Sequence, residues 1–83
     1  MYNLHISKRA EREIEKLPFE IQDQILDALT EIKENPYFGK PLAQKHIGKF
    51  SYRVGAYRII YKIYETEKRI FIFTAGHRST VYK

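Results

Sequence analysis

The stretch KFSYRVGAYRIIYK, residues 49–62, predicts two antiparallel strands joined by a tight turn. Gly55 and Ala56 stand at the centre of that turn, because glycine at the first central position suits a two-residue type II′ hairpin. The pairing register follows, since the side-chain repeat of a strand is two residues. One face then carries three apolar pairs and is the predicted core face: Val54 with Tyr57, Tyr52 with Ile59, and Phe50 with Tyr61.

The opposite face of this hairpin is basic. The same register sets Arg53 opposite Arg58, Ser51 opposite Ile60 and Lys49 opposite Lys62. Like charges placed directly opposite each other in a sheet are destabilising. We interpret a face that collects such pairs as a binding surface for a polyanion.

The charge is divided unevenly along the 83 residues. Residues 1–35 contain five Lys/Arg and eight Asp/Glu, whereas residues 36–83 contain ten Lys/Arg and two Asp/Glu. The net charge of +5 therefore comes from the predicted sheet half. This asymmetry is typical of proteins that bind nucleic acid or phosphate, while a merely soluble basic surface is the plainer interpretation.

The part of the chain before the hairpin predicts a strand and two helices. Residues 2–6 alternate as a strand does, and Ser7 is placed to cap a helix over residues 8–17. Pro18 suits the first position of a second helix. That helix runs to about Glu34 with an apolar stripe of Ile21, Ile25, Ala28, Leu29 and Ile32, and Asn35-Pro36 ends it.

The rest of the chain predicts a loop over residues 36–48, with a fragment of strand at 46–47, and a turn over 64–69. Residues 70–75 are apolar on both sides, which marks a strand covered on both faces and therefore central. Gly76 ends that strand, and a polar tail follows. We expect one α+β domain over residues 1–83, with two N-terminal helices packed on a four-stranded, mainly antiparallel sheet.

Several function classes lack the residues that they need. There is no cysteine, and His5, His46 and His77 stand far apart without a metal-ligand motif. The sheet half has only two acids, both in a turn, so neither a metal site nor an acid/base carboxylate pair is expected. A Ser-His-Asp arrangement and a Gly-rich phosphate loop are also absent, so no cofactor is expected. Nothing resembles a signal peptide or a membrane span, which makes a soluble cytoplasmic protein the expectation.

Three residues are the candidates for chemistry. Arg58 lies in the middle of the predicted sheet on its basic face, where it could stabilise a pentavalent phosphate. Arg78 follows a strand end, and Tyr82 could stack on a base. The plainer interpretations are a surface arginine lying along Ile60, a solvated charge in the tail, and a ring that closes the core.

Four further residues are candidates for RNA binding. Lys49 and Arg53 are better suited to positioning phosphates than to catalysis, and Lys62 lies near the rim of the basic face. His77 could act as an acid or a base, and a plain histidine in the tail is the equal alternative.

Three stretches resemble the RelE/ParE superfamily of bacterial and archaeal toxins: LPFEIQDQILDALTEIKENP, FSYRVGAYRIIYKI and FTAGHRSTVYK. They cover nearly the whole chain in the order of the family. The string YRVGAYRIIY followed by GHR…VY is similar to the RelE branch, whose members cut mRNA in the ribosomal A site. The resemblance implies a metal-independent reaction in which the RNA 2′-hydroxyl attacks its own 3′ phosphate. It also implies the ribosome with its mRNA and a cognate antitoxin as partners.

By position, Arg58 resembles the arginine of the sheet that stabilises the phosphate in the family. Arg78 resembles the arginine at the strand end that assists the leaving group, and Tyr82 resembles the tyrosine that stacks on a codon base. Ser51 departs from the pattern, because other members have a second lysine there, and Lys49 is a possible substitute. The alternatives are a ParE-like poison of DNA gyrase with the same fold, or an inactive homologue that only binds its antitoxin.

Overall fold

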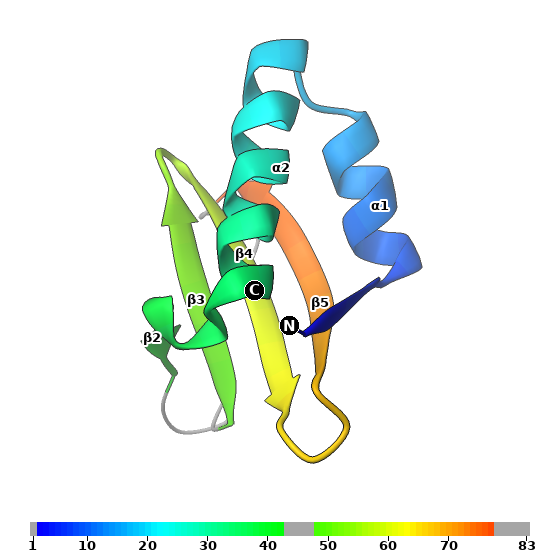
Figure 1. Cartoon of the computed structure of the whole chain (residues 1–83). Coiled ribbons are helices and arrows are strands. Elements are labelled where there is room, and N and C mark those ends of the chain that lie inside the picture. The colour runs from blue at the N-terminus through cyan, green and yellow to red at the C-terminus, as the bar shows by residue number, and fades with distance from the viewer. Residues whose placement is uncertain (1, 43–47, 78–83) are drawn as a thin grey trace.

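The computed structural model describes residues 2–42 and 48–77. These residues form five strands, two α-helices and one short 3-10 helix: β1 (Asn3–Ile6), α1 (Lys8–Glu15), α2 (Phe19–Glu34), η1 (Pro36–Phe38), β2 (Lys40–Pro41), β3 (Lys49–Val54), β4 (Tyr57–Tyr64) and β5 (Arg69–His77). Both helices lie on the same face of the sheet, with α1 beside β5 and α2 across β3 and β4 (Figure 1). Neither helix in the described ranges is long and apolar enough to cross a bilayer. The α+β class predicted from the sequence is confirmed.

The strand order of the sheet is β1-β5-β4-β3-β2. β1 pairs with β5 in parallel, and the other three pairs are antiparallel. The sheet therefore has one strand more than the four predicted, and that strand is β2, where Lys40 pairs with Ser51 and Pro41 with Phe50. Proline has no N–H to donate to a second neighbouring strand, so β2 suits the edge of the sheet. A strand of two residues is too short to show an alternating pattern, so the sequence here resembles a loop. The predicted fragment at residues 46–47 lies outside the described residues.

The hairpin between β3 and β4 has the predicted register. All six pairs from Lys49 with Lys62 to Val54 with Tyr57 are formed. Gly55 has a φ of 58°, and among the described non-glycine residues only Lys68 has a positive φ, so Ala56 has the negative value that a type II′ turn requires. The predicted turn is confirmed.

The predicted central position of β5 is confirmed, because it lies between β1 and β4. Its predicted end is wrong: Gly76 continues the ladder opposite Arg58, and the strand extends to His77. The helices cover one face of β5, while Phe71 and Phe73 on the other face are only half-buried.

A β-bulge in β5 changes which residues face the helices. Ile60 pairs with Thr74 and Tyr61 pairs with Ile72, so Phe73 is the extra residue. Before the bulge, Ile70 and Ile72 face the core, and after it Ala75 does, fully buried. A one-residue shift moves every later side chain to the other face of a strand.

The core lies between the helices and the sheet. Its buried apolar residues come from four elements: Ala10, Ile25, Ala28, Leu29, Ile32, Ile59, Tyr61, Ile70, Ile72 and Ala75. The Tyr61 ring is fully buried, as predicted from its place on the core face. Its hydroxyl donates to the Pro36 carbonyl at 2.6 Å and accepts from the Gly39 N–H at 3.2 Å, which fixes η1 against β4. A Cβ atom at Gly39 would collide with that hydroxyl, so only glycine allows this approach.

The helix ends match the sequence with small differences. Ser7 caps α1 as predicted, because its Oγ accepts from the Ala10 N–H at 3.0 Å. The first helix ends at Glu15, two residues before the predicted end, and α2 begins at Phe19 with Pro18 as its N-cap. Asn35 follows the last helical residue Glu34, as predicted.

Candidate nucleic-acid interface

The face of the sheet turned away from the helices, called here the outer face, carries most of the predicted site residues. By pairing and alternation its residues are Lys49, Ser51 and Arg53 of β3, Arg58, Ile60 and Lys62 of β4, and Phe71, Phe73, Thr74 and Gly76 of β5. β4 is the middle strand of five, so its outward side chains lie at the centre of this surface.

Arg58 lies half-buried on the outer face. It pairs with Arg53 on one side and with Gly76 on the other. Gly76 has no side chain and therefore adds none beside Arg58 within this pair. A half-buried guanidinium is held with less motion than an exposed one, which suits a group that must meet charge developing at a defined place.

Two predicted lysines lie over aromatic rings. The Lys49 Nζ is 4.3 Å from the centroid of the Phe73 ring, and the Lys62 Nζ is 5.2 Å from that of Tyr64. A cation over the face of an aromatic ring is attracted by the ring quadrupole. These contacts hold the ammonium groups of Lys49 and Lys62 on the outer face, where both contribute positive charge.

Ser51 has surroundings that the sequence alone could not give. It is only 4% exposed, and its partner in β2 is the exposed residue Lys40. Directly paired residues of two strands point to the same face, so Lys40 lies beside Ser51, the position at which the resemblance implies a second lysine. The sequence did not indicate Lys40 as a site residue, because Lys40 is placed beside Ser51 only by the two-residue strand β2.

Arg53 pairs with Arg58 as predicted, whereas His77 lies on the opposite face of the sheet. The Arg53 Nε donates to the Gly55 carbonyl at 3.4 Å, and the side chain lines a groove between α2 and β3. The bulge in β5 turns His77 to the helix side, where its ring meets Tyr57 edge-on at 5.7 Å. The sequence placed His77 in a polar tail, whereas the structure makes it the last residue of β5, and its part in RNA binding stays a prediction.

Arg78 and Tyr82 lie outside the described residues. Their predicted roles stay predictions that rest on the resemblance of the ending GHR…VY. Among residues 2–42 and 48–77, no group of three or more His, Cys, Asp or Glu is placed to hold a metal ion.

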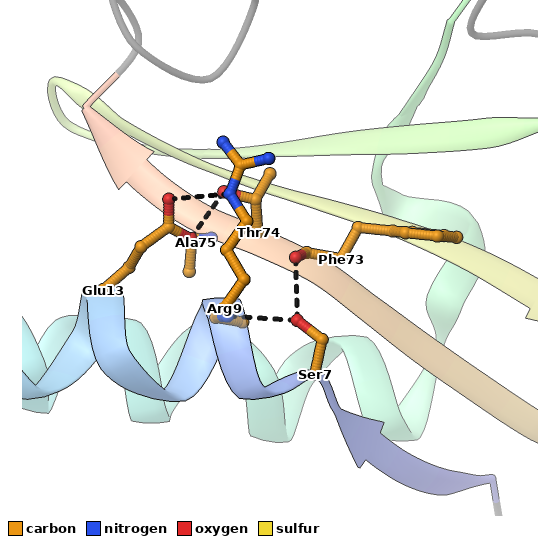
Figure 2. A network of polar contacts seen from close by, with 7 residues as sticks. Ser7, Arg9, Glu13, Phe73, Thr74 and Ala75 are labelled. Atoms are coloured by element: carbon orange, nitrogen blue, oxygen red, sulfur yellow. Dashed lines mark hydrogen bonds and ion pairs between the residues drawn. The ribbon is translucent and has the colours of Figure 1, made fainter.

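Glu13 of α1 fixes the strand that leads toward this site (Figure 2). Its Oε1 accepts from the Thr74 hydroxyl at 2.5 Å and from the Ala75 N–H at 3.0 Å, and Arg9 contacts its other oxygen at 3.4 Å. β1 ends before this level, so the carboxylate takes the place that a backbone carbonyl of a neighbouring strand would have. Glu13 looks like any other charged helix position in the sequence and could not be singled out there.

A second polar cluster joins the turn between β4 and β5 to distant parts of the chain. The Glu65 carboxylate accepts from Lys68 at 2.5 Å, from Tyr37 at 2.6 Å and from Tyr2 at 2.8 Å. These hydrogen bonds, that of Lys68 first, lower the pKa of Glu65 to about 2. The bond to Glu65 is also the main reason that the pKa of Tyr37 is raised to about 12. The cluster lies on an exposed rim and holds η1 and β1 to the turn.

Comparison with known proteins gives a consistent result for the whole chain. A family model described as "ParE toxin of type II toxin-antitoxin system, parDE" matches residues 4–82. The toxin RelG of Mycobacterium tuberculosis is 31% identical over 84 aligned positions, which cover 99% of this chain and 97% of RelG. The toxin RelE of the same organism is also 31% identical, over 99% of this chain and 87% of that protein.

Solved structures agree with these relatives. The toxin-antitoxin complex RelBE2 of M. tuberculosis contains a chain with a TM-score of 0.84 and 32% identity, and the alignment covers 93% of this chain and 98% of that one. The isolated RelE toxin of E. coli has a TM-score of 0.79 and 25% identity, over 99% of this chain and 92% of RelE. The helix pair, the sheet and nearly the full length are thus shared with these toxins. The chain belongs to the RelE/ParE family and is a toxin of the type II toxin-antitoxin class.

Proposed function

We propose that this toxin is a ribosome-dependent endoribonuclease that cuts mRNA in the ribosomal A site. The observation that carries the proposal is the half-buried Arg58 at the centre of the outer face, between Arg53 and Gly76. The relatives named RelG and RelE, and the RelE-like ending GHR…VY, support the same branch. A cognate antitoxin is the proposed partner, because the solved relatives include toxin-antitoxin complexes.

The proposed reaction is a transfer of the phosphoryl group within the RNA. The 2′-oxygen forms a bond to the adjacent phosphorus and loses its proton, while the bond from phosphorus to the 5′-oxygen breaks and that oxygen gains a proton. The products are a 2′,3′-cyclic phosphate and a 5′-hydroxyl. Arg58 stabilises the extra negative charge of the pentavalent phosphate, and Arg78 assists the leaving oxygen.

The other basic residues supply binding in this proposal. Lys40 and Lys49 both neighbour Ser51, so they put two positive charges where the family has its second lysine. Lys62 extends the basic surface toward the turn between β4 and β5. Tyr82 stacks on a codon base, as the resemblance implies. The metal-independence of the reaction is part of the proposal, since these residues act through charge and position alone.

The test is single-turnover cleavage of mRNA on saturated programmed ribosomes. Removing one preorganised donor costs about a hundred- to a thousand-fold in rate, so Arg58→Ala and Arg78→Ala should each slow cleavage by about that factor. Lys8→Ala, an exposed substitution on the helix side, is the matched charge control and should keep the wild-type rate. Tyr82→Phe should retain most of the activity and Tyr82→Ala should lose much more. Wild-type cleavage by Arg58→Ala would contradict the assignment.

A second candidate function is the poisoning of DNA gyrase, which the description of the matching family model as a ParE toxin favours. The two functions give different products in the same cells. Cleaved mRNA with intact chromosomes supports the nuclease, and DNA double-strand breaks with intact mRNA support gyrase poisoning. Equal cleavage of free and ribosome-bound mRNA would refute ribosome dependence.

A further inference from the structure

A cleft of about 310 Å³ lies at the end of the outer face that is far from Arg58. Its lining comes from β1, β4, β5 and the turn before β5: His5, Tyr64, Glu67, Arg69 and Phe71. Because β5 lies between β1 and β4, His5 and Tyr64 form the two rims, with Phe71 and Arg69 between them. A volume of this size is at the lower end of the range of small-ligand sites.

The cleft contains an aromatic surface that is open to solvent. The rings of His5 and Phe71 are stacked, with centroids 5.2 Å apart and an interplanar angle of 20°. His5 is exposed. The Phe71 ring also packs edge-on against the Phe73 ring, with centroids 4.6 Å apart. Tyr64 on the opposite rim is 36% exposed. Exposed rings placed around an open site are the usual platform for bases of single-stranded RNA.

Charges of both signs complete the site. Arg69 lines the cleft, and the Lys62 ammonium lies over the Tyr64 ring, so phosphates are attracted to its edge. Glu67 is the acidic residue among the lining side chains, and its carboxylate can accept two hydrogen bonds at once. A guanine base presents two adjacent N–H donors on its Watson–Crick edge, which match a carboxylate, whereas uracil presents one N–H between two carbonyls.

We propose that this cleft binds a base of single-stranded RNA, with a preference for guanine over uracil. This inference rests on the proposed function, because it takes the RNA as the ligand, and it adds a contact beyond the phosphate at Arg58. Tyr64 is six residues from Arg58 along β4, which corresponds to about 20 Å at the rise of a strand. Lys62 and its partner Lys49 lie between the two sites, so one strand of RNA can follow the cations from the cleft to Arg58.

The test measures binding of two short fluorescein-labelled single-stranded RNAs to the full chain by anisotropy. One RNA has a single guanine among uracils, and the other has an abasic site in place of that guanine, so that the phosphates are the same. One stacked base corresponds to a change of at least about fivefold in affinity, which the wild type should show between the two RNAs. His5→Ala and Tyr64→Ala should lose this difference, and His5→Phe should retain it. Phe38→Ala, an exposed aromatic of η1, is the control and should retain it too.

Each outcome decides the inference. Equal binding of the two RNAs by the wild type, no binding of either, or an unchanged difference in both His5→Ala and Tyr64→Ala would overturn it. Circular dichroism of each variant separates lost binding from lost folding, and His5→Phe keeps the test valid if His5→Ala does not fold. The proposed function is judged separately, by wild-type cleavage on ribosomes. If the wild type cleaves mRNA but does not discriminate between the two RNAs, only the proposed base-binding role of the cleft is refuted. If it discriminates between the RNAs but does not cleave mRNA, only the proposed nuclease activity is refuted.

Discussion

Replacing Tyr61 by phenylalanine removes one oxygen atom from the best-buried contact between the sheet and η1. The ring is fully buried, and its hydroxyl bridges the Pro36 carbonyl and the Gly39 N–H. Phenylalanine keeps the ring packing, so the change isolates the two hydrogen bonds. Both backbone groups would then stay next to a ring edge that can neither donate nor accept.

The size of the effect follows from these two groups. An unsatisfied buried donor or acceptor costs about 1–3 kcal/mol. With two groups affected and partial relaxation of η1, we expect Tyr61→Phe to lower the free energy of unfolding by about 2–4 kcal/mol. For a domain of this size each kcal/mol corresponds to about 4–8 °C in Tm. Tyr64→Phe in the same strand is the control, because that side chain is partly exposed.

The assay is urea unfolding followed by circular dichroism, repeated at several pH values. Burial raises the pKa of Tyr61 to about 12 from its ordinary value of 10.0. The stability that its neutral hydroxyl contributes is therefore complete below pH 10 and is lost as the pH rises toward about 12. The gap between wild type and Tyr61→Phe should narrow over that range. A gap below about 1 kcal/mol at neutral pH, or one that widens above pH 10, would refute the reasoning.

Two further predictions concern the polar clusters. Glu13→Ala leaves the Ala75 N–H without its acceptor and should lower the free energy of unfolding by about 1–3 kcal/mol in urea titrations. Glu13→Gln keeps an acceptor oxygen and should lose less, while the exposed control Glu15→Ala should stay within about 0.5 kcal/mol; equal losses for all three would contradict the assigned role. Because the pKa of Glu65 is lowered to about 2 from 4.5, its contribution is present above pH 4.5 and is lost as the pH falls. Wild-type stability should thus fall more steeply than that of Glu65→Gln between pH 4.5 and 2, and parallel curves would argue against the cluster.

The hairpin could be predicted from the sequence because its information is local. Gly55 fixes the turn, and the turn fixes every pair up to Lys49 with Lys62. The same reasoning predicted the core side of Tyr61 and the outward side of Arg58. Alternation within one strand and the chemistry of one turn are enough for these assignments.

The remaining features depend on contacts between segments that are far apart in the sequence. The bulge at Phe73 has no signature in the run of apolar residues, yet it turns His77 away from Arg58. Lys40 became a neighbour of Ser51 only through the edge strand β2. Glu13 accepts hydrogen bonds from β5 because β1 ends where β5 continues. The pattern of residues along α1 does not indicate this contact. Each of these required the partner strand to be known.

The parallel pairing of β1 with β5 has a consequence for the synthesis of the protein. Asn3 pairs with Arg69, so β1 is synthesised 66 positions before the strand with which it pairs. Chains grow at about 5–20 residues per second, so that interval lasts several seconds on the translating ribosome. During this time the sheet cannot close and the surface around Arg58 is not assembled, because β5 supplies its Gly76 side. If the protein acts on ribosomes as proposed, the ribosome that makes it meets no folded toxin until β5 has been synthesised.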